Sequence, residues 1–388
     1  MSFLRRIPTR RLIALCASVV LAAAAGTAIA LAAGSSVSPP PAKPLAAAIH
    51  DAVAAAPVQG VSARIRFTNH LIDGASLPGN DPVLTGASGR LWATADGRAR
   101  LELQGDQGSG TGDVQVTLDG DRLAVYDSQQ RTVYRMTLPR HSGEQRKETG
   151  TPPSVARIQR ELTRLATHLD LSGAQPGAVA GRPAYTVRVT PKHDGGLLGG
   201  AELAWDADHG IPLRAAVYAA GRTDPVLDLA ATEISFGPVD PARLKVTPPP
   251  GTKTVTVATP APPRGGEHAR HVDGLSAVAQ RVHFNLSAPR TLVGLPRTGV
   301  SLVDGGGEPG ALVTYGRGLG AIAVIQTPVR QGERKLPDSL PKVSINGATG
   351  TELDTALGTV VHFERAGVAY TVLGSVPPAA AEAAARGL

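Results

Sequence analysis

Apolar and polar residues alternate along the first half of the chain as they do in an antiparallel sheet. Residues 61–67 (VSARIRF) carry an apolar side chain at every second position, which is the period of a half-buried strand. The same alternation recurs on both sides of residues 95–97 (ADG) and residues 119–121 (DGD), two short polar turns typical of β-hairpins. Its continuation as far as Met136 predicts at least five antiparallel strands in succession.

A second group of strands is predicted within residues 179–236. Apolar residues alternate with polar ones in residues 185–189 and again in residues 202–205, and residues 206–210 (DADHG) have the composition of a turn. Residues 227–236 supply the last strands of this group. Because the stretch contains sheet strands and polar turns but no catalytic motif, it favours a protein that holds a ligand on a sheet face.

Two helices are predicted to accompany these strands. Apolar residues recur at helical spacing in residues 45–56 (LAAAIHDAVAAA), which precede Pro57. A second helix of about 16 residues is predicted to begin after its capping residue Ser154 and to stop near Gly173. We expect its apolar face to cover the sheet, and the alternative is a lid over a cavity. The lid-helix candidates on that face are Val155, Ile158, Leu162 and Leu165.

Proline-rich segments divide the chain into domains. Residues 248–270 contain PPPG and TPAPPRGGE, break the periodicity and are predicted to form a linker. The first domain is therefore predicted to span residues 45–247. Residues 271–388 are predicted to form a small C-terminal α+β domain that ends in an alanine-rich helix opened by Pro377 and Pro378.

The N-terminal segment has the pattern of an export signal. Residues 5–11 (RRIPTRR) carry four arginines, and the apolar or small residues 12–33 that follow are long enough to cross a bilayer. Small residues in this run also satisfy a cleavage rule, so residues 1–34 are predicted to be either a signal peptide or a membrane anchor. Residues 35–44 form a Pro-rich spacer. We expect the rest of the chain at the extracytoplasmic face of the cell membrane.

Composition and motifs exclude several classes of function. The net charge of the 388 residues is +7, but four positive charges lie in residues 5–11 and the others are dispersed, which argues against a nucleic-acid partner. The one cysteine, Cys16, lies in the apolar leader and leaves the exported part without thiol chemistry. His268 and His271 have helical spacing but lie in the Pro/Gly-rich linker without an obvious third ligand, so we expect no metal site. Hydrolase and phosphate-loop motifs are missing, so we expect no enzyme activity and no cofactor.

Several stretches of the first domain resemble a known family. They are VYDSQQRTVYRMTLP (125–139), VAGRPAYTVRVTP (179–191), AWDADHGIPLR (204–214) and ISFGPVD (234–240). In this order the sequence resembles, over about residues 45–250, the LolA-like lipoprotein carriers and their relatives in high-GC Gram-positive bacteria. The resemblance implies an unclosed, antiparallel half-barrel whose concave apolar face is covered by helices and can receive acyl chains. The C-terminal unit, with YGRGLGAIAVIQ (315–326) and YTVLGSVPPAAAEAAARGL (370–388), is similar to the second domain of the periplasmic stress regulators called RseB.

The sequence therefore predicts an α+β protein, a half-barrel covered by helices followed by a small α+β domain. The predicted function is non-enzymatic binding or carriage of lipid or lipoprotein acyl chains. The alternative is an envelope-stress or signalling regulator that binds a membrane protein partner, and an exported hydrolase comes third. The cavity candidates are Trp92, Tyr185, Val187, Val189, Leu203, Trp205 and Phe236. Which face of the strands is concave stays open, because a shift of one residue moves every side chain to the other face.

Overall fold

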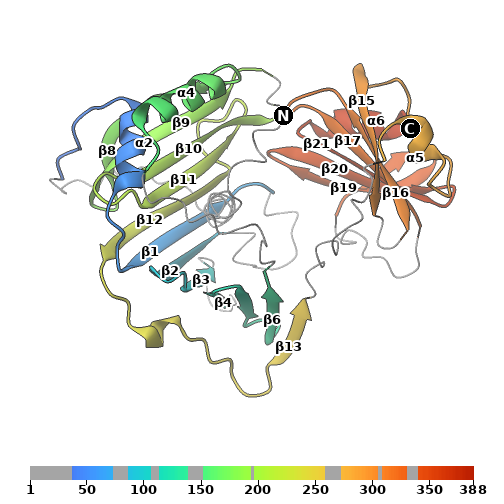
Figure 1. The fold of residues 1–388 in the computed structure, drawn as a ribbon. Coiled ribbons are helices and arrows are strands. Elements are labelled where there is room, and N and C mark those ends of the chain that lie inside the picture. The colour runs from blue at the N-terminus through green and yellow to red at the C-terminus, as the bar shows by residue number, and fades with distance from the viewer. Residues whose placement is uncertain are drawn as a thin grey trace.

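The chain is an α+β protein in which each of two domains is built on one sheet (Figure 1). The computed structural model describes residues 37–72, 86–105, 113–138, 152–193, 196–257, 272–304, 308–329 and 340–388. The predicted leader, residues 1–34, and the start of the spacer lie outside these ranges. Within the residues that the structure describes, no helix combines the length and the apolar character needed to cross a bilayer.

The first domain is a curled 13-stranded sheet in which β7 and β13 lie at opposite ends of the strand order. The order is β13-β6-β5-β4-β3-β2-β1-β12-β11-β10-β9-β7, with β8 also paired to β9. The strands are β1 (Gly60–Asn69), β2 (Ala87–Thr94), β3 (Ala99–Gly105), β4 (Asp113–Asp119), β5 (Arg122–Asp127), β6 (Thr132–Thr137), β7 (Leu169–Leu171), β8 (Gln175–Val179), β9 (Arg182–Pro191), β10 (Leu198–Asp206), β11 (Pro212–Ala219), β12 (Leu227–Phe236) and β13 (Lys253–Val257). This unclosed half-barrel confirms the fold class predicted from the sequence.

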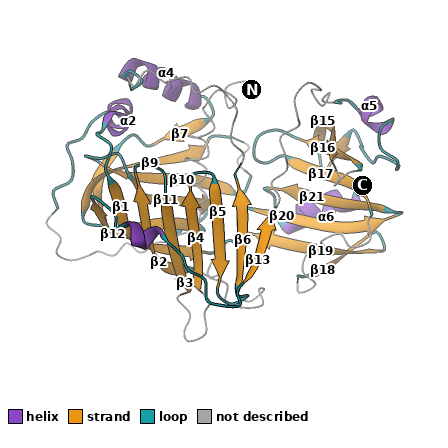
Figure 2. Cartoon of the chain, turned by 60° about the horizontal axis from the view of Figure 1, so that its bottom comes forward, coloured by secondary structure: helices purple, strands orange, loops and turns teal. Residues whose placement is uncertain are grey.

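Strand register gives the half-barrel one apolar and one polar face. Phe67 of β1 lies opposite Leu229 of β12 and Ala87 of β2, and the positions between them carry polar residues such as Arg66 and Ser88. A short 3-10 helix, η2 (Pro241–Leu244), lies on the outer, convex side of the sheet (Figure 2). The apolar side chains therefore face the concave side, as alternation along a strand requires.

Two helices lie beside β9 and β10 at one end of the half-barrel (Figure 1). They are α2 (Leu45–Ala54) and α4 (Val155–Leu165), and the hydroxyl of Ser154 caps α4 by accepting a hydrogen bond from the amide of Arg157. The second helix is shorter than the predicted length, because Leu169 starts β7 and does not continue the helix. Residues 169–171 instead pair with the otherwise free edge of β9, where their backbone groups find partners.

The turn between β10 and β11 fixes α2 on the sheet. Gly210 has a φ of +66°, and a Cβ there would lie 2.2 Å from the carbonyl oxygen of Ala52 in α2. We expect Gly210→Ala to lower the free energy of unfolding by roughly 1–3 kcal/mol, because it combines left-handed strain with a backbone clash. Gly97→Ala is the matched control, since Gly97 has a φ of +86° but open space around it. Urea denaturation of both variants tests this, and equal losses would contradict the clash with α2.

The second domain is an eight-stranded antiparallel sheet with helices on one side. Its order is β14-β15-β16-β17-β21-β20-β19-β18. The elements are α5 (Leu275–Ala279), β14 (Thr291–Leu292), β15 (Leu295–Asp304), β16 (Pro309–Tyr315), β17 (Ile322–Pro328), β18 (Lys342–Ile345), β19 (Ala348–Thr355), β20 (Gly358–Arg365), β21 (Val368–Gly374) and α6 (Pro378–Arg386). Its core joins alanines of α6 to the side chains of Val361, Phe363 and Val372. The predicted proline-opened, alanine-rich C-terminal helix is thus confirmed.

The predicted linker at residues 248–270 needs a correction. Residues 253–257 (KTVTV) form β13, which pairs in parallel with β6 and extends the sheet of the first domain. The alternation of valine with polar residues in this short run allows it to bind the free edge of β6. Residues 258–271, which include His268 and His271, lie outside the described residues.

Backbone hydrogen bonds join the two domains at two places. The amide of Ala356, after β19, donates to the carbonyl of Leu71, after β1, at 2.7 Å. The amide of Leu197, before β10, donates to the carbonyl of Ser375 at 3.1 Å and to its hydroxyl at 2.9 Å. The ends of β1 and β10 therefore meet the second domain.

Candidate functional site

The middle of the concave face is a continuous apolar surface. Strands β2, β3 and β4 place only alanine, glycine, leucine and valine on this side. The buried residues of the surface are Val61, Ala63, Ile65, Phe67, Ala87, Leu101 and Leu103, and half-buried neighbours include Leu91, Val114, Val116 and Leu229. We call this set the concave apolar surface.

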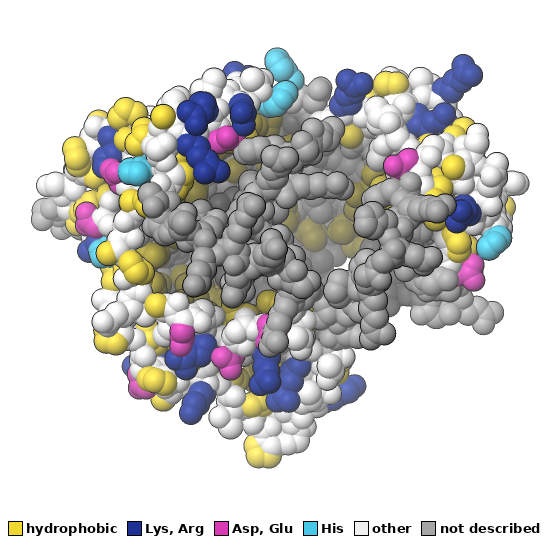
Figure 3. All heavy atoms as spheres, viewed as in Figure 1, with side chains coloured by type: hydrophobic (Ala, Val, Ile, Leu, Met, Phe, Trp, Pro, Cys, Tyr) yellow, Lys and Arg dark blue, Asp and Glu magenta, His cyan; other side chains and the backbone are white. Residues whose placement is uncertain are grey.

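The concave apolar surface continues toward β5 and β6. Val116 of β4 lies opposite Val125 of β5, which lies opposite Tyr134 of β6. All three side chains are half-buried. In Figure 3, hydrophobic side chains are visible between the two domains, at the border of the residues drawn in grey. The surface therefore spans several strands without a charged side chain at its centre.

Five of the predicted cavity residues form a second cluster, which packs against α2. Tyr185, Val187 and Val189 of β9 and Leu203 and Trp205 of β10 share the concave side with Ala48 of α2. The rings of Tyr185 and Trp205 have centroids 6.1 Å apart, and the Tyr185 hydroxyl donates to the carbonyl of Pro41 at 2.6 Å. The structure brings these residues together and α2 covers them, and their part in ligand binding stays a prediction.

The other two predicted cavity residues lie outside this cluster, and Phe236 packs against the concave apolar surface. Phe236 is half-buried at the end of β12, opposite Val61, with the His209 ring at a centroid distance of 4.2 Å. Trp92 lies on the convex side, opposite Ser62 and Arg100, because it falls on the polar positions of β2. Guanidinium groups of Arg100 and Arg243 lie 5.7 and 5.9 Å from its ring centroid. Trp92 therefore holds η2 against the sheet and does not share a surface with the others.

The lid-helix candidates divide into buried and exposed residues. Ile158 is buried and Leu162 half-buried, whereas Val155 is 40% exposed and Leu165 is 42% exposed. The helix that carries them lies against α2 (Figure 1), and the nearby imidazole Nδ1 of His50 lies 3.0 Å from the carbonyl of Pro153. Thus only the centre of the predicted apolar face of α4 is buried.

Asp206, Asp208 and His209 are the described residues whose ligand atoms come close enough to hold a metal ion. Asp206 is buried, and its Oδ1 accepts hydrogen bonds from the amides of Asp208 (3.1 Å) and His209 (2.8 Å), while Oδ2 accepts from Arg182 Nε at 2.8 Å. Burial acts to raise the pKa of Asp206, but the hydrogen bonds from Arg182 and His209 outweigh it and lower that pKa. These bonds close the β10–β11 turn, which explains why the three residues lie together.

A buried ion network on the convex face was not predicted from the sequence. Arg214 of β11 donates from Nε to both carboxylate oxygens of Asp228, at 3.0 and 2.9 Å, and from Nη1 to Glu202. Burial acts to lower the pKa of Arg214, but the hydrogen bonds and charge of Asp228 outweigh it and raise that pKa. Polar residues at alternate positions predict solvent exposure, so the sequence carried no sign that these groups are buried.

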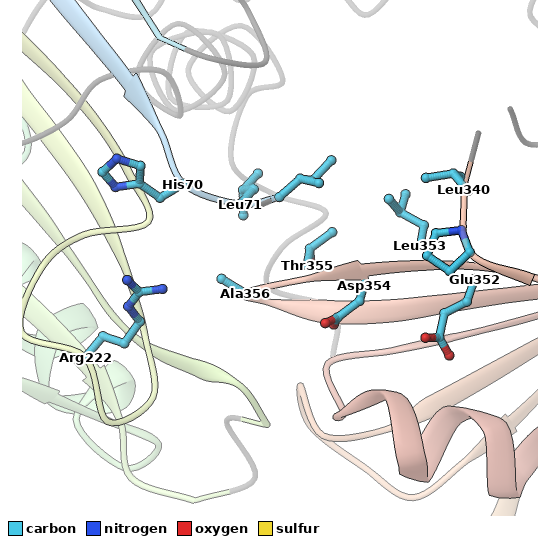
Figure 4. Close-up of a pocket in the computed structure, with 11 residues that line it drawn as sticks. His70, Leu71, Arg222, Leu340, Glu352, Leu353, Asp354, Thr355 and Ala356 are labelled. Carbon is cyan, nitrogen blue, oxygen red and sulfur yellow. The ribbon is translucent and has the colours of Figure 1, made fainter. Parts of the chain in front are cut away.

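A pocket of about 550 Å³ lies where the two domains meet (Figure 4). Its lining comes from the end of β1 and the β11–β12 turn on one side and from residues around β19 on the other. The lining residues are His70, Leu71, Ile72, Arg222, Leu340, Pro341, Glu352, Leu353, Asp354, Thr355 and Ala356. The pocket begins just after β1, whose Phe67 belongs to the concave apolar surface.

Among known proteins, the chain is similar to several solved structures. No protein-family model and no curated protein matches the chain. The chain is similar to the Pseudomonas aeruginosa MucA/MucB complex structure, at 19% identity and a TM-score of 0.40 over 88% of this chain and 94% of that one. MucB in complex with MucA(peri) gives 19% identity and a TM-score of 0.39 with the same coverage. A LolA superfamily protein of Nitrosomonas europaea gives 8% identity and a TM-score of 0.23 over 53% of this chain and 99% of that one. Because these TM-scores lie below 0.5, the fold described above rests on the strand pairing of this chain alone.

Proposed function

We propose that the protein is a non-enzymatic, extracytoplasmic binder or carrier of lipid or lipoprotein acyl chains. The acyl chains are held on the concave apolar surface. The observation that carries the proposal is the side-chain composition of β2, β3 and β4, which place no polar side chain on that face. An acyl chain needs no hydrogen bond and is held by burial alone. This explains why a binding protein of this kind has no polar motif in its sequence.

The concave apolar surface crosses the strands from β12 to β6. Each buried ligand methylene contributes about 0.8 kcal/mol, so ten of them contribute roughly 8 kcal/mol before the entropy of binding is subtracted. On β2 the surface carries Ala87, Gly89 and Ala93, and the side chain of Leu103 fills the space beside Gly89. The leucines of β3 therefore supply much of the apolar contact.

We further propose that α4 acts as a lid at the end of the half-barrel. Val155 and Leu165 are exposed although they belong to the apolar face of this helix. An acyl chain emerging beside α2 would cover them, at a gain of about 25 cal/mol for each Å² removed from water. The α2–α4 pair would then close over the bound chain.

The proposal is tested on protein purified from its host without detergent. Native mass spectrometry is expected to show adducts with the mass of acyl-bearing lipids, and delipidated protein is expected to take up a fluorescent fatty acid. Protein that carries no acyl species and takes up no fatty acid would contradict the proposal. Turnover of an ester substrate that one Asp or His substitution abolishes would instead indicate a hydrolase.

A further inference from the structure

The pocket between the domains has walls of opposite charge. The barrel domain contributes His70 and Arg222, and the second domain contributes Glu352 and Asp354 from β19 (Figure 4). Figure 4 shows the Arg222 side chain across a gap from Asp354. Within the described part of the chain, neither the side chain of Arg222 nor that of His70 forms an ion pair, and Asp354 only accepts a long hydrogen bond from Thr359 at 3.4 Å. The opposite charges therefore face each other without neutralising one another.

Glu352 lines the acidic wall, but its carboxylate points toward α6 (Figure 4). It is 8% exposed, and its Oε2 atom has no hydrogen-bond partner among the described residues. An oxygen closed off from solvent accepts nothing from a ligand in the pocket, so the Glu352 carboxylate belongs to the contact between β19 and α6. Burial raises the pKa of Glu352, and the charges of Glu382 and Asp354 add to this effect. The nearby cation, Arg386, is already paired with Glu382. Asp354 is therefore the carboxylate that the acidic wall presents to the pocket.

The position of the pocket connects it to the concave apolar surface. His70, Leu71 and Ile72 directly follow β1, whose apolar side chains form the centre of that surface. Leu71, Ile72, Leu340 and Leu353 give the pocket an apolar lining between its charged walls. A volume of about 550 Å³ lies within the range of about 300–1,000 Å³ that small-molecule sites occupy.

We infer that this pocket binds the headgroup of a zwitterionic phospholipid. Arg222 and His70 contact the phosphate, Asp354 accepts hydrogen bonds from the ammonium group, and the acyl chains run from Leu71 onto the concave apolar surface. The inference rests on the proposed function, because it requires that surface to hold the chains. A purely anionic headgroup would bring its charge toward Asp354 without a donor for that carboxylate, and a purely cationic ligand would leave Arg222 unpaired. A headgroup that carries both charges satisfies both walls at once.

This inference also gives the second domain a part in binding. The barrel domain supplies the apolar surface and the basic wall, and β19 supplies the acidic wall. The hydrogen bond between Ala356 and Leu71 holds the two walls next to each other. The ligand would therefore be recognised by its chains in one domain and by its headgroup in both.

Calorimetry with the full chain and soluble short-chain lipids tests the inference. Dihexanoyl phosphatidylethanolamine is expected to bind about tenfold more tightly than dihexanoyl phosphatidylglycerol, because charge-assisted hydrogen bonds distinguish the two headgroups. Arg222→Gln and Asp354→Asn are each expected to abolish this preference and to leave fatty-acid uptake unchanged. Arg90→Gln, which removes an exposed arginine of β2, is the matched control and is expected to keep the preference.

The outcomes separate the headgroup site from the acyl site. Equal affinity for both lipids, or a preference that survives Arg222→Gln and Asp354→Asn, would overturn the inference while fatty-acid uptake still supported the proposed function. If the wild-type chain takes up no fatty acid, the proposed function is refuted. Phosphorylethanolamine, which has no acyl chain, is expected to compete with the short-chain phosphatidylethanolamine in the wild-type chain, and failure to compete would also count against the pocket.

Discussion

Replacing Asp228 with alanine is expected to lower the free energy of unfolding of the barrel domain by about 3–5 kcal/mol. The carboxylate is 0% exposed and accepts three hydrogen bonds from Arg214, two from Nε and one from Nη2 at 2.6 Å. Its removal leaves the half-buried guanidinium of Arg214 paired only with Glu202 and the Tyr218 hydroxyl. An uncompensated buried charge costs more than the interaction that it has lost. Urea denaturation followed by tryptophan fluorescence measures the effect, because Trp92 and Trp205 both lie in the barrel domain.

Two controls make this measurement specific. Glu233→Ala removes the partner of Arg64 in an ion pair whose side chains are 60% and 67% exposed, and it is expected to cost less than about 1 kcal/mol. The double variant Arg214→Met/Asp228→Leu removes both charges of the pair and is expected to recover much of the stability lost in Asp228→Ala. If Asp228→Ala and Glu233→Ala cost the same, the buried network does not stabilise the sheet in this way.

Replacing Val116 with aspartate is expected to reduce fatty-acid affinity by at least about tenfold, because an acyl chain cannot repay the dehydration of a carboxylate. Val116 lies in the middle of the concave apolar surface, between Leu101 and Val125. Its side chain is only half-buried, so a charge there reaches solvent in the unliganded protein and the fold is expected to tolerate it. Titration with a fluorescent fatty acid gives the affinity.

The matched control is the next residue along the same strand. Thr117 is also half-buried but lies on the convex side, opposite Arg100 and Ala124. Thr117→Asp introduces the same charge, one residue away, and is expected to leave fatty-acid affinity unchanged. Equal losses of affinity in the two variants would place the ligand somewhere other than the concave apolar surface.

Much of the fold could be predicted from local patterns. Alternation in residues 61–67, the two polar turns at 95–97 and 119–121, and helical spacing in residues 45–56 each correspond to an element of the structure. These signals are local, since each depends on neighbouring residues along the chain. The predicted α+β class, with a half-barrel and a smaller second domain, is confirmed. It could be predicted because these local signals indicate most of its strands and helices.

Features that depend on pairing between distant segments could not be predicted. Leu169 continues the helical spacing that begins at Val155, but its backbone pairs with β9 and ends the helix early. KTVTV, residues 253–257, lies between proline-rich segments, and its strand character becomes visible only beside β6.

The grouping of the candidate residues could be predicted in part, and their role in binding stays a prediction. Five of the seven cavity candidates come together beside α2, because they share one alternation on two neighbouring strands. Trp92 was chosen for its size, and only the register with Ser62 and Arg100 shows that it lies on the convex side. The junction pocket joins residues 70–72 to residues 352–356, which no local pattern connects.

The most direct test of acyl-chain binding places a tryptophan on each face of β4. Val116→Trp and Thr117→Trp are made separately in a chain whose own tryptophans, Trp92 and Trp205, are replaced by phenylalanine. A brominated fatty acid, which quenches tryptophan on contact, is then titrated into each variant. We expect strong, saturable quenching of the tryptophan at position 116 and none at position 117. Quenching only at position 117, or at neither position while the fatty acid binds, would contradict the proposal that the concave apolar surface holds the acyl chain.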